Sequence, residues 1–227
     1  MLNILHINSR SLPRNFDEML TLLNSFSTYP DILGITKTWL SNINKDHYHI
    51  SGYHSYHLTR SLRPHGGVTL FVSNKLQSDQ LTNFTIINDD IEINTVKITS
   101  NNFNFIVRAI YRPNSKHIGV DEFTNTLTSL LYKDHLRKNK VIIIGDLNIN
   151  LLEHTSHTPT NNFLSSLQSI IFFPHISRPT RFPDNENLSE PSLLDHVYTN
   201  FNCKFSSGIL HYPISDHLPI FMCLFFL

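Results

Sequence analysis

The sequence predicts an α/β domain in which β-sheets pack face to face and helices lie outside them. Three observations lead to this fold class. Short apolar runs rich in β-branched and aromatic residues recur from end to end. Stretches with helical spacing are fewer and lie scattered between those runs. Hydrophobic residues make up 40% of the 227 residues and no Gly/Ser/Pro-rich linker divides them, so we expect one domain over residues 1–227.

The apolar runs predict the strands. Residues 91–99 alternate partially between apolar and polar side chains, as expected of a half-buried strand. Residues 141–144 are apolar throughout, as expected of a strand covered on both faces. The clearest expected strands cover residues 2–7, 32–36, 67–73, 91–99, 103–111, 141–145, 196–199 and 218–226.

Apolar side chains recur at helical spacing in three stretches, each preceded by polar residues that can cap a helix. The first covers residues 16–23 after Asn15, and the second covers residues 123–131 after Asp121. The third covers residues 163–170 after a Thr/Asn stretch. Strand order does not follow from these patterns.

Charge and cysteine usage limit the function classes. Lys plus Arg equals Asp plus Glu at 18 each, so any attraction for phosphate must come from a local patch. Polar residues interrupt the N-terminal apolar run, so it does not resemble a secretory signal. The last apolar run has about half of the ~20 residues that a membrane helix needs. We expect an intracellular protein without a membrane contact, with Cys203 and Cys223 as buried free thiols.

Polar residues follow several predicted strands, which is where α/β folds usually place reactive groups. Asn8 ends the first strand and could orient a metal ligand or simply form a turn. A charged residue, Lys37, follows the second. Tyr111 and Arg112, followed by a proline and Asn114, end the fifth. This pair could present a phenol and a guanidinium to phosphate, or could be a rim aromatic beside a solvated arginine.

The segment after residues 141–144 is the most informative. Gly145, Asp146 and Asn148 follow this wholly apolar strand. Residues i and i+2 of an extended segment point the same way, so the carboxylate and the amide could address one water molecule. An Asx turn that closes the strand is the alternative.

An aspartate stands beside a histidine twice, at Asp195-His196 and at Asp216-His217. Adjacent side chains diverge in an extended chain, so Asp216 and His217 should have different tasks. His217 would then need an orienting acid from elsewhere, and Asp195 is the obvious candidate.

Phosphate esters explain these residues better than peptides or sugars do. The sequence has no GxSxG nucleophile elbow, no HExxH motif and no P-loop. Carboxylate and amide oxygens suit Mg²⁺, with Mn²⁺ as an alternative, and Mg²⁺ neutralises phosphate charge. We therefore expect a metal-dependent phosphodiesterase.

Eight stretches resemble the endonuclease/exonuclease/phosphatase superfamily, and more narrowly the apurinic-type endonuclease domain of LINE-like (non-LTR) retrotransposons. They read LNILHINSRSL, DILGITKTWL, GGVTLFV, AIYRPN, IIIGDLNINLL, SRPTR, LLDHVYTN and SDHLPIF, and span residues 2–221. GDLN followed by a terminal SDHLP is specific, and SRPTR with LLDHVYTN points to the retrotransposon branch. The resemblance implies a four-layer α/β sandwich of two mixed β-sheets.

The resemblance also implies catalytic roles. His217 would contact the scissile phosphate and Asp195 would pair with it. Asp146 would activate the attacking water with help from Asn148, and Tyr111 would steady the phosphate. Asn8 and Asp216 would belong to the metal environment. The basic and amide residues expected to bind phosphate or DNA are Arg112, Asn114, Arg178 and Arg181.

The sequence departs from the family at Lys37. The resembling segment has a glutamate there, the principal metal ligand, whereas this chain reads Thr36-Lys37-Thr38 and has no glutamate nearby. A charged lysine cannot bind Mg²⁺ and would repel it. Either the copy is inactivated, or the ammonium partly replaces the charge of the cation and contacts phosphate directly.

Three functions remain open. The first is a DNA endonuclease that nicks duplex DNA with Mg²⁺ and is impaired by Lys37. It would be nuclear if it acts on genomic DNA. Its partner would be a reverse-transcriptase domain that is absent from this sequence. The second is a degenerate domain that binds nucleic acid without cutting. The third is a phosphatase of the same superfamily, against which SRPTR and LLDHVYTN argue.

Overall fold

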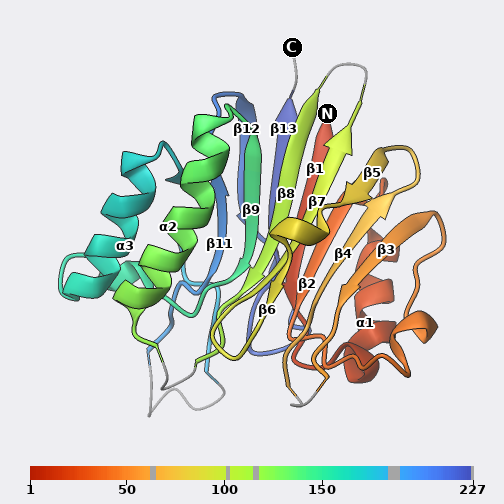
Figure 1. The fold of residues 1–227 in the computed structure, drawn as a ribbon. Helices are drawn as coiled ribbons and strands as arrows, with labels where there is room; N and C mark the ends of the chain where they lie inside the picture. Colours follow the sequence, from red (N-terminus) through yellow and green to blue (C-terminus); the bar gives the residue numbers. More distant parts are fainter. Residues whose placement is uncertain (62–64, 101–102, 115–117, 184–189, 226–227) are drawn as a thin grey trace.

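Two mixed β-sheets pack face to face in the computed structural model, and three helices cover their outer faces (Figure 1). The structure describes residues 1–61, 65–100, 103–114, 118–183 and 190–225. Helix α1 (Leu12–Ser25) lies on one sheet, and α2 (Val120–Leu136) and α3 (Thr158–Ser169) lie side by side on the other. The four-layer α/β sandwich predicted from the sequence is confirmed.

The first sheet has the strand order β12-β13-β1-β2-β4-β3, with β1 and β2 parallel and the other neighbours antiparallel. Alternate residues of β1 divide between two layers. Ile4 joins the core between the sheets, whereas Leu5 packs beneath α1 with Met19. The strands are β1 (Leu2–Asn8), β2 (Ile32–Thr36), β3 (Tyr53–Leu58), β4 (Val68–Ser73), β12 (Lys204–Ile209) and β13 (Ile220–Phe225).

The second sheet has the order β10-β11-β9-β8-β7-β5, and β6 pairs with β7. Its only parallel pair among the described strands is β8 with β9. Phe123 of α2 and Phe163 of α3 are fully buried against it. The strands are β5 (Gln77–Gln80), β6 (Ile86–Ile87), β7 (Glu92–Thr99), β8 (Asn104–Tyr111), β9 (Val141–Asp146), β10 (Phe173–Pro174) and β11 (Asp195–Thr199).

Two glycines permit close approaches in the middle of the sandwich. A Cβ on Gly34 of β2 would lie 2.4 Å from Cδ1 of Ile144 in β9, so the two sheets meet closely there. Gly145 has φ +149°, and a Cβ there would lie 1.9 Å from the carbonyl oxygen of Ile110. A side chain at position 145 would therefore collide with the neighbouring strand just before Asp146.

The expected strands are present, but the sequence reading missed several others. The missed strands are β3, β5, β6, β10 and β12, which are short or carry polar, exposed residues. The helices begin earlier than expected. For α1, Ser11 is the cap and Asn15 lies at an internal kink. Phe226, expected at the end of the last strand, lies outside the described residues.

Three short 3-10 helices complete the described structure, at Lys45–His47 (η1), Thr82–Phe84 (η2) and Leu151–Glu153 (η3). Cys203 and Cys223 are free and only partly buried, rather than fully buried as expected. Among the described residues, no helix is long and apolar enough to cross a membrane.

Candidate active site

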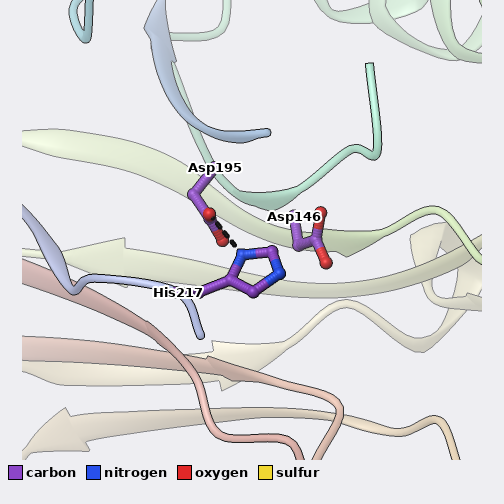
Figure 2. Close-up of side chains that lie close together, drawn as sticks. All are labelled: Asp146, Asp195 and His217. Carbon is purple, nitrogen blue, oxygen red and sulfur yellow. Dashed lines mark hydrogen bonds and ion pairs between the residues drawn. The ribbon is translucent and has the colours of Figure 1, made fainter. Parts of the chain in front are cut away.

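Side chains from both sheets converge at one end of the sandwich. Asn8 is the last residue of β1, Tyr111 of β8 and Asp146 of β9. Asp195 begins β11, and the antiparallel register places it opposite Asp146. His217 lies just before β13 and completes the group (Figure 2). The strand ends thus bring together residues that are up to 209 positions apart, from Asn8 to His217.

His217 and Asp195 form a buried dyad. Nδ1 of His217 lies 2.7 Å from Oδ2 of Asp195, and Figure 2 shows the imidazole between this carboxylate and Asp146. Thr180 donates its hydroxyl hydrogen to the same Asp195 oxygen at 2.7 Å. Nδ1 of His6 lies 3.7 Å from the other oxygen. The dyad thus leaves the second ring nitrogen of His217 directed away from Asp195.

Burial and the neighbouring charge set the protonation of this dyad. Burial disfavours the imidazolium of His217, but the Asp195 carboxylate outweighs it and raises the pKa of His217. Burial likewise opposes ionisation of Asp195, yet His217 lowers the pKa of that carboxyl. His6 differs, because burial lowers its pKa despite the same carboxylate. The two histidines beside Asp195 therefore shift in opposite directions, His217 towards the charged form and His6 towards the neutral form.

Asp146 is fully buried and is held from the opposite sheet. Its Oδ2 accepts a hydrogen bond from Nδ2 of Asn8 at 2.7 Å. The ammonium of Lys37 lies 2.9 Å from the same oxygen, and the lysine side chain is 18% exposed. This ammonium also lies 5.4 Å from the ring centroid of Tyr111, a cation-π distance. Burial, with the Asp146 charge next, raises the pKa of the Tyr111 phenol.

The loop after β9 differs from the extended segment expected there. Asn148 has φ 47°, so its side chain does not share the direction of Asp146. Its amide donates to the carbonyl oxygen of Arg112 at 2.6 Å, while its backbone N–H donates to Oδ1 of Asp146 at 3.1 Å. The Asx turn considered from the sequence therefore describes this loop.

The predicted phosphate-binding residues are not all free to bind phosphate. Arg112 is buried, donates to the carbonyl oxygens of Asn148 and Ile118, and lies over the Phe123 ring. It therefore fastens the loop after β9. Asn114 is exposed beyond the end of β8.

The Asp216 carboxylate is held between two arginines. Nη1 of Arg10 lies 2.9 Å from one carboxylate oxygen, and Nε of Arg181 donates to the other at 2.9 Å. Burial opposes ionisation, but His217 and the two arginines lower the pKa of Asp216.

Arg178 lines a separate pocket of about 420 Å³. The sequence reading gave no role to Arg10, although the HINSR stretch contains it.

His196, the other histidine that follows an aspartate, supports the loop after β9 from inside. It is fully buried, and its Nε2 lies 3.1 Å from the carbonyl oxygen of Ile149. Burial lowers its pKa to about 4. Thr180, whose hydroxyl holds Asp195, was also missed, and its position inside the SRPTR stretch was the available signal.

The sequence model of the endonuclease/exonuclease/phosphatase family matches residues 2–217. The chain belongs to this family. A comparison with curated protein sequences found no match. The family comprises hydrolases, both nucleases and phosphatases, and the family membership and fold suggested by the resemblance are confirmed.

Solved structures show the same fold at low sequence identity. The endonuclease domain of TRAS1, a telomere-specific non-LTR retrotransposon, has 12% identity and a TM-score of 0.71, covering 99% of this chain and 98% of that one. The 3′ phosphatase NExo from Neisseria, bound to product DNA hairpin, has 15% identity and a TM-score of 0.73, with both chains fully covered. The AP endonuclease LMAP from Leishmania major has 14% identity and a TM-score of 0.72, covering 97% and 86%.

The donor set of this family member includes a cluster that could hold a metal ion. Asp146, Asp195 and His217 each offer one ligand atom, and these atoms lie within 4.8 Å of one another. Their present contacts do not fit a divalent cation. The ammonium of Lys37 lies against Asp146, and the Asp195 oxygen nearest His217 is bound by that histidine. A cation could use Asp146 only after Lys37 moved away, because two positive groups would otherwise compete for one oxygen.

Proposed function

We propose that this chain is a DNA endonuclease domain of the retrotransposon type whose hydrolytic step is suppressed by Lys37. The observation that carries the proposal is the 2.9 Å contact between the Lys37 ammonium and Oδ2 of Asp146. Asp146 is fully buried, so this contact is poorly screened by solvent. In the family pattern a glutamate stands at the lysine position, so a cation now lies where an anion is expected.

The remaining residues are suited to a phosphodiester. The raised pKa of His217 favours the charged imidazole, whose second nitrogen can donate to a phosphate oxygen beside Asp146. Lys37 adds a second positive group at the same place. The site can therefore attract a phosphate without assistance from a bound cation.

Hydrolysis also needs a group that orients or deprotonates water, and here Asp146 is compromised. One of its oxygens contacts both Asn8 and Lys37. The other accepts the backbone N–H of Asn148. Few acceptor positions remain for a water molecule, so binding should persist better than cleavage.

DNA as the substrate, a role for Mg²⁺ or Mn²⁺ and a reverse-transcriptase partner rest on the similarity to retrotransposon and apurinic endonucleases. One solved relative is a 3′ phosphatase bound to a product DNA hairpin, and another is the endonuclease domain of a retrotransposon. A second function, binding of DNA without any cleavage, is favoured by the same Lys37 contact. In both cases the phosphodiester would lie beside His217.

Nicking of supercoiled plasmid DNA with Mg²⁺ tests the proposal. The wild type is compared with Lys37→Glu, with Lys37→Glu combined with His217→Ala, and with Lys75→Glu, which reverses one exposed charge away from the site. We expect Lys37→Glu to nick at least about tenfold faster, equivalent to ~1.4 kcal/mol in the barrier, and His217→Ala to abolish the gain. Lys75→Glu should match the wild type.

Equal nicking by the wild type and Lys37→Glu would refute suppression by the lysine. Gel-shift assays of the same proteins separate the two functions. Retained DNA binding with no nicking by any variant would favour a binding domain. Release of inorganic phosphate from 3′-phosphorylated DNA by Lys37→Glu, without nicking, would favour a phosphatase instead.

A further inference from the structure

A basic pocket lies at the end of the sandwich opposite the candidate active site. Its volume is about 370 Å³, and it lies between the start of β8, the end of α2 and the turn that leads into β9. Strand β9 runs from this pocket at Lys140 to the active site at Asp146. Six strand residues span about 20 Å, so the two places are separate.

Four cationic side chains line this pocket, and most have no acidic partner. They are Lys97, Arg137, Lys138 and Lys140. Lys97 faces Asp79 across β7 and β5. Arg137, Lys138 and Lys140 are exposed and form no ion pair with any residue that the structure describes. In a chain of zero net charge, this is a local concentration of positive charge.

The single acid among the described lining residues is already neutralised. Asp134 is buried and forms an ion pair with Nη1 of Arg108, while its other oxygen accepts a hydrogen bond from Nδ2 of Asn139 at 3.0 Å. It therefore cannot compensate the exposed cations. It also fixes Asn139, so the turn that carries Lys138 is held in place.

The guanidinium of Arg108, which forms the ion pair with Asp134, is fully buried next to the pocket. Nε and Nη2 of Arg108 have no hydrogen-bond partner among the described residues. Its Cζ lies 5.9 Å from the ring centroid of Phe84, and that of Arg137 lies 5.6 Å from the same centroid. The ring also holds Arg137 at the pocket rim.

We propose that this pocket binds phosphate groups of a nucleic-acid backbone, at a contact separate from the active site. Arg and Lys side chains around a single site are suited to phosphate oxygens, and each phosphate neutralised releases counterions. A nucleic-acid segment bound in this pocket would differ from a segment bound at the active site, because about 20 Å of sheet separates the two places. The inference does not depend on whether the cleft cuts DNA.

Fluorescence anisotropy of a labelled 12-nucleotide single-stranded DNA, measured over a series of KCl concentrations, tests the pocket. The wild type is compared with a double variant, Arg137→Gln with Lys138→Gln. A control with the same change of charge combines Lys75→Gln with Lys204→Gln, two exposed lysines outside the pocket. The slope of log K against log salt should become shallower by about 1.4 in the pocket variant, from ~0.7 for each of two lost phosphate contacts. The control should keep the wild-type slope.

Equal slopes for the wild type and the pocket variant would overturn the proposal, as would an equal loss in the control. Binding of inorganic phosphate that the pocket substitutions abolish, together with an unchanged salt slope for DNA, would identify a free-phosphate site and overturn nucleic acid as the source. Nicking is measured separately by placing the pocket substitutions in Lys37→Glu. An unchanged nicking rate with a reduced salt slope supports a site independent of the cleft. Loss of nicking with an unchanged salt slope overturns the proposal of a separate phosphate-binding pocket.

Discussion

Replacing Lys37 by glutamate should make the stability of the protein depend on Mg²⁺. The substitution removes an ammonium 2.9 Å from a fully buried carboxylate and adds a second negative charge beside it. At an effective dielectric constant of about 20, two unit charges at this distance interact by about 6 kcal/mol. Loss of one partner of a buried ion pair costs ~3–5 kcal/mol in measured cases, so we expect a loss of this order without metal.

This loss of stability corresponds to a fall in the melting temperature. One kcal/mol shifts the midpoint by roughly 2–4 °C in a domain of this size, so Lys37→Glu in EDTA should melt about 6–20 °C below the wild type. A cation at a concentration 100-fold above its dissociation constant returns about 2.7 kcal/mol. Mg²⁺ should therefore recover roughly 5–11 °C in the variant.

Differential scanning calorimetry with EDTA and with Mg²⁺ measures both effects. The wild type should melt at the same temperature in the two buffers, because the ammonium already neutralises Asp146. Lys37→Met is the matched control, since it loses the ion pair but gains no ligand, and Mg²⁺ should not restore it. The reasoning is refuted if Mg²⁺ stabilises the wild type as much as Lys37→Glu, or if Lys37→Glu is as stable as the wild type in EDTA.

Three further substitutions test the fold around the site. Burial lowers the pKa of His196 to about 4 from 6.5, so its contribution to stability is present above pH 6.5 and is lost as the pH falls towards 4. Denaturant titrations should show a shallower acid loss in His196→Gln, by up to ~1.4 kcal/mol per pH unit, and parallel profiles would contradict this. Gly145→Ala should lower stability by at least ~1–3 kcal/mol, because its Cβ meets the carbonyl of Ile110 at positive φ; a neutral effect in urea would contradict the geometry. Phe163→Ala should cost about 3–5 kcal/mol by leaving a cavity beneath α3, and a loss below about 1 kcal/mol would show that the core collapses around it.

The fold class followed from local patterns, because the central strands are apolar enough to be recognised alone. Strand β9 is fully buried on both faces, which explains its uninterrupted run of apolar residues. The edge and short strands escaped detection for the opposite reason. Gln77–Gln80 and Lys204–Ile209 carry exposed polar residues, and long-range pairing alone makes them strands.

In the candidate site the sequence predicted the pairing of His217 with Asp195, but not the contact between Lys37 and Asp146. Polar residues at strand ends indicated Asn8, Asp146 and His217. Whether Lys37 reaches Asp146 depends on how the two sheets pack, which no local pattern reports. The direction of the Asn148 side chain was missed because its backbone leaves the extended region at φ 47°. The sequence pattern therefore specified the chemistry, while the spacing between layers determined which atoms meet.

The close approach of Gly34 to Ile144 has a consequence for the candidate active site. Asn8 and Lys37 belong to one sheet and Asp146 to the other, so the contacts between them cross from sheet to sheet. The spacing between the two sheets therefore determines the distances from Asn8 and Lys37 to Asp146. A bulkier side chain at position 34 would push the sheets apart and lengthen the contacts of Asn8 and Lys37 with Asp146, without altering any polar group.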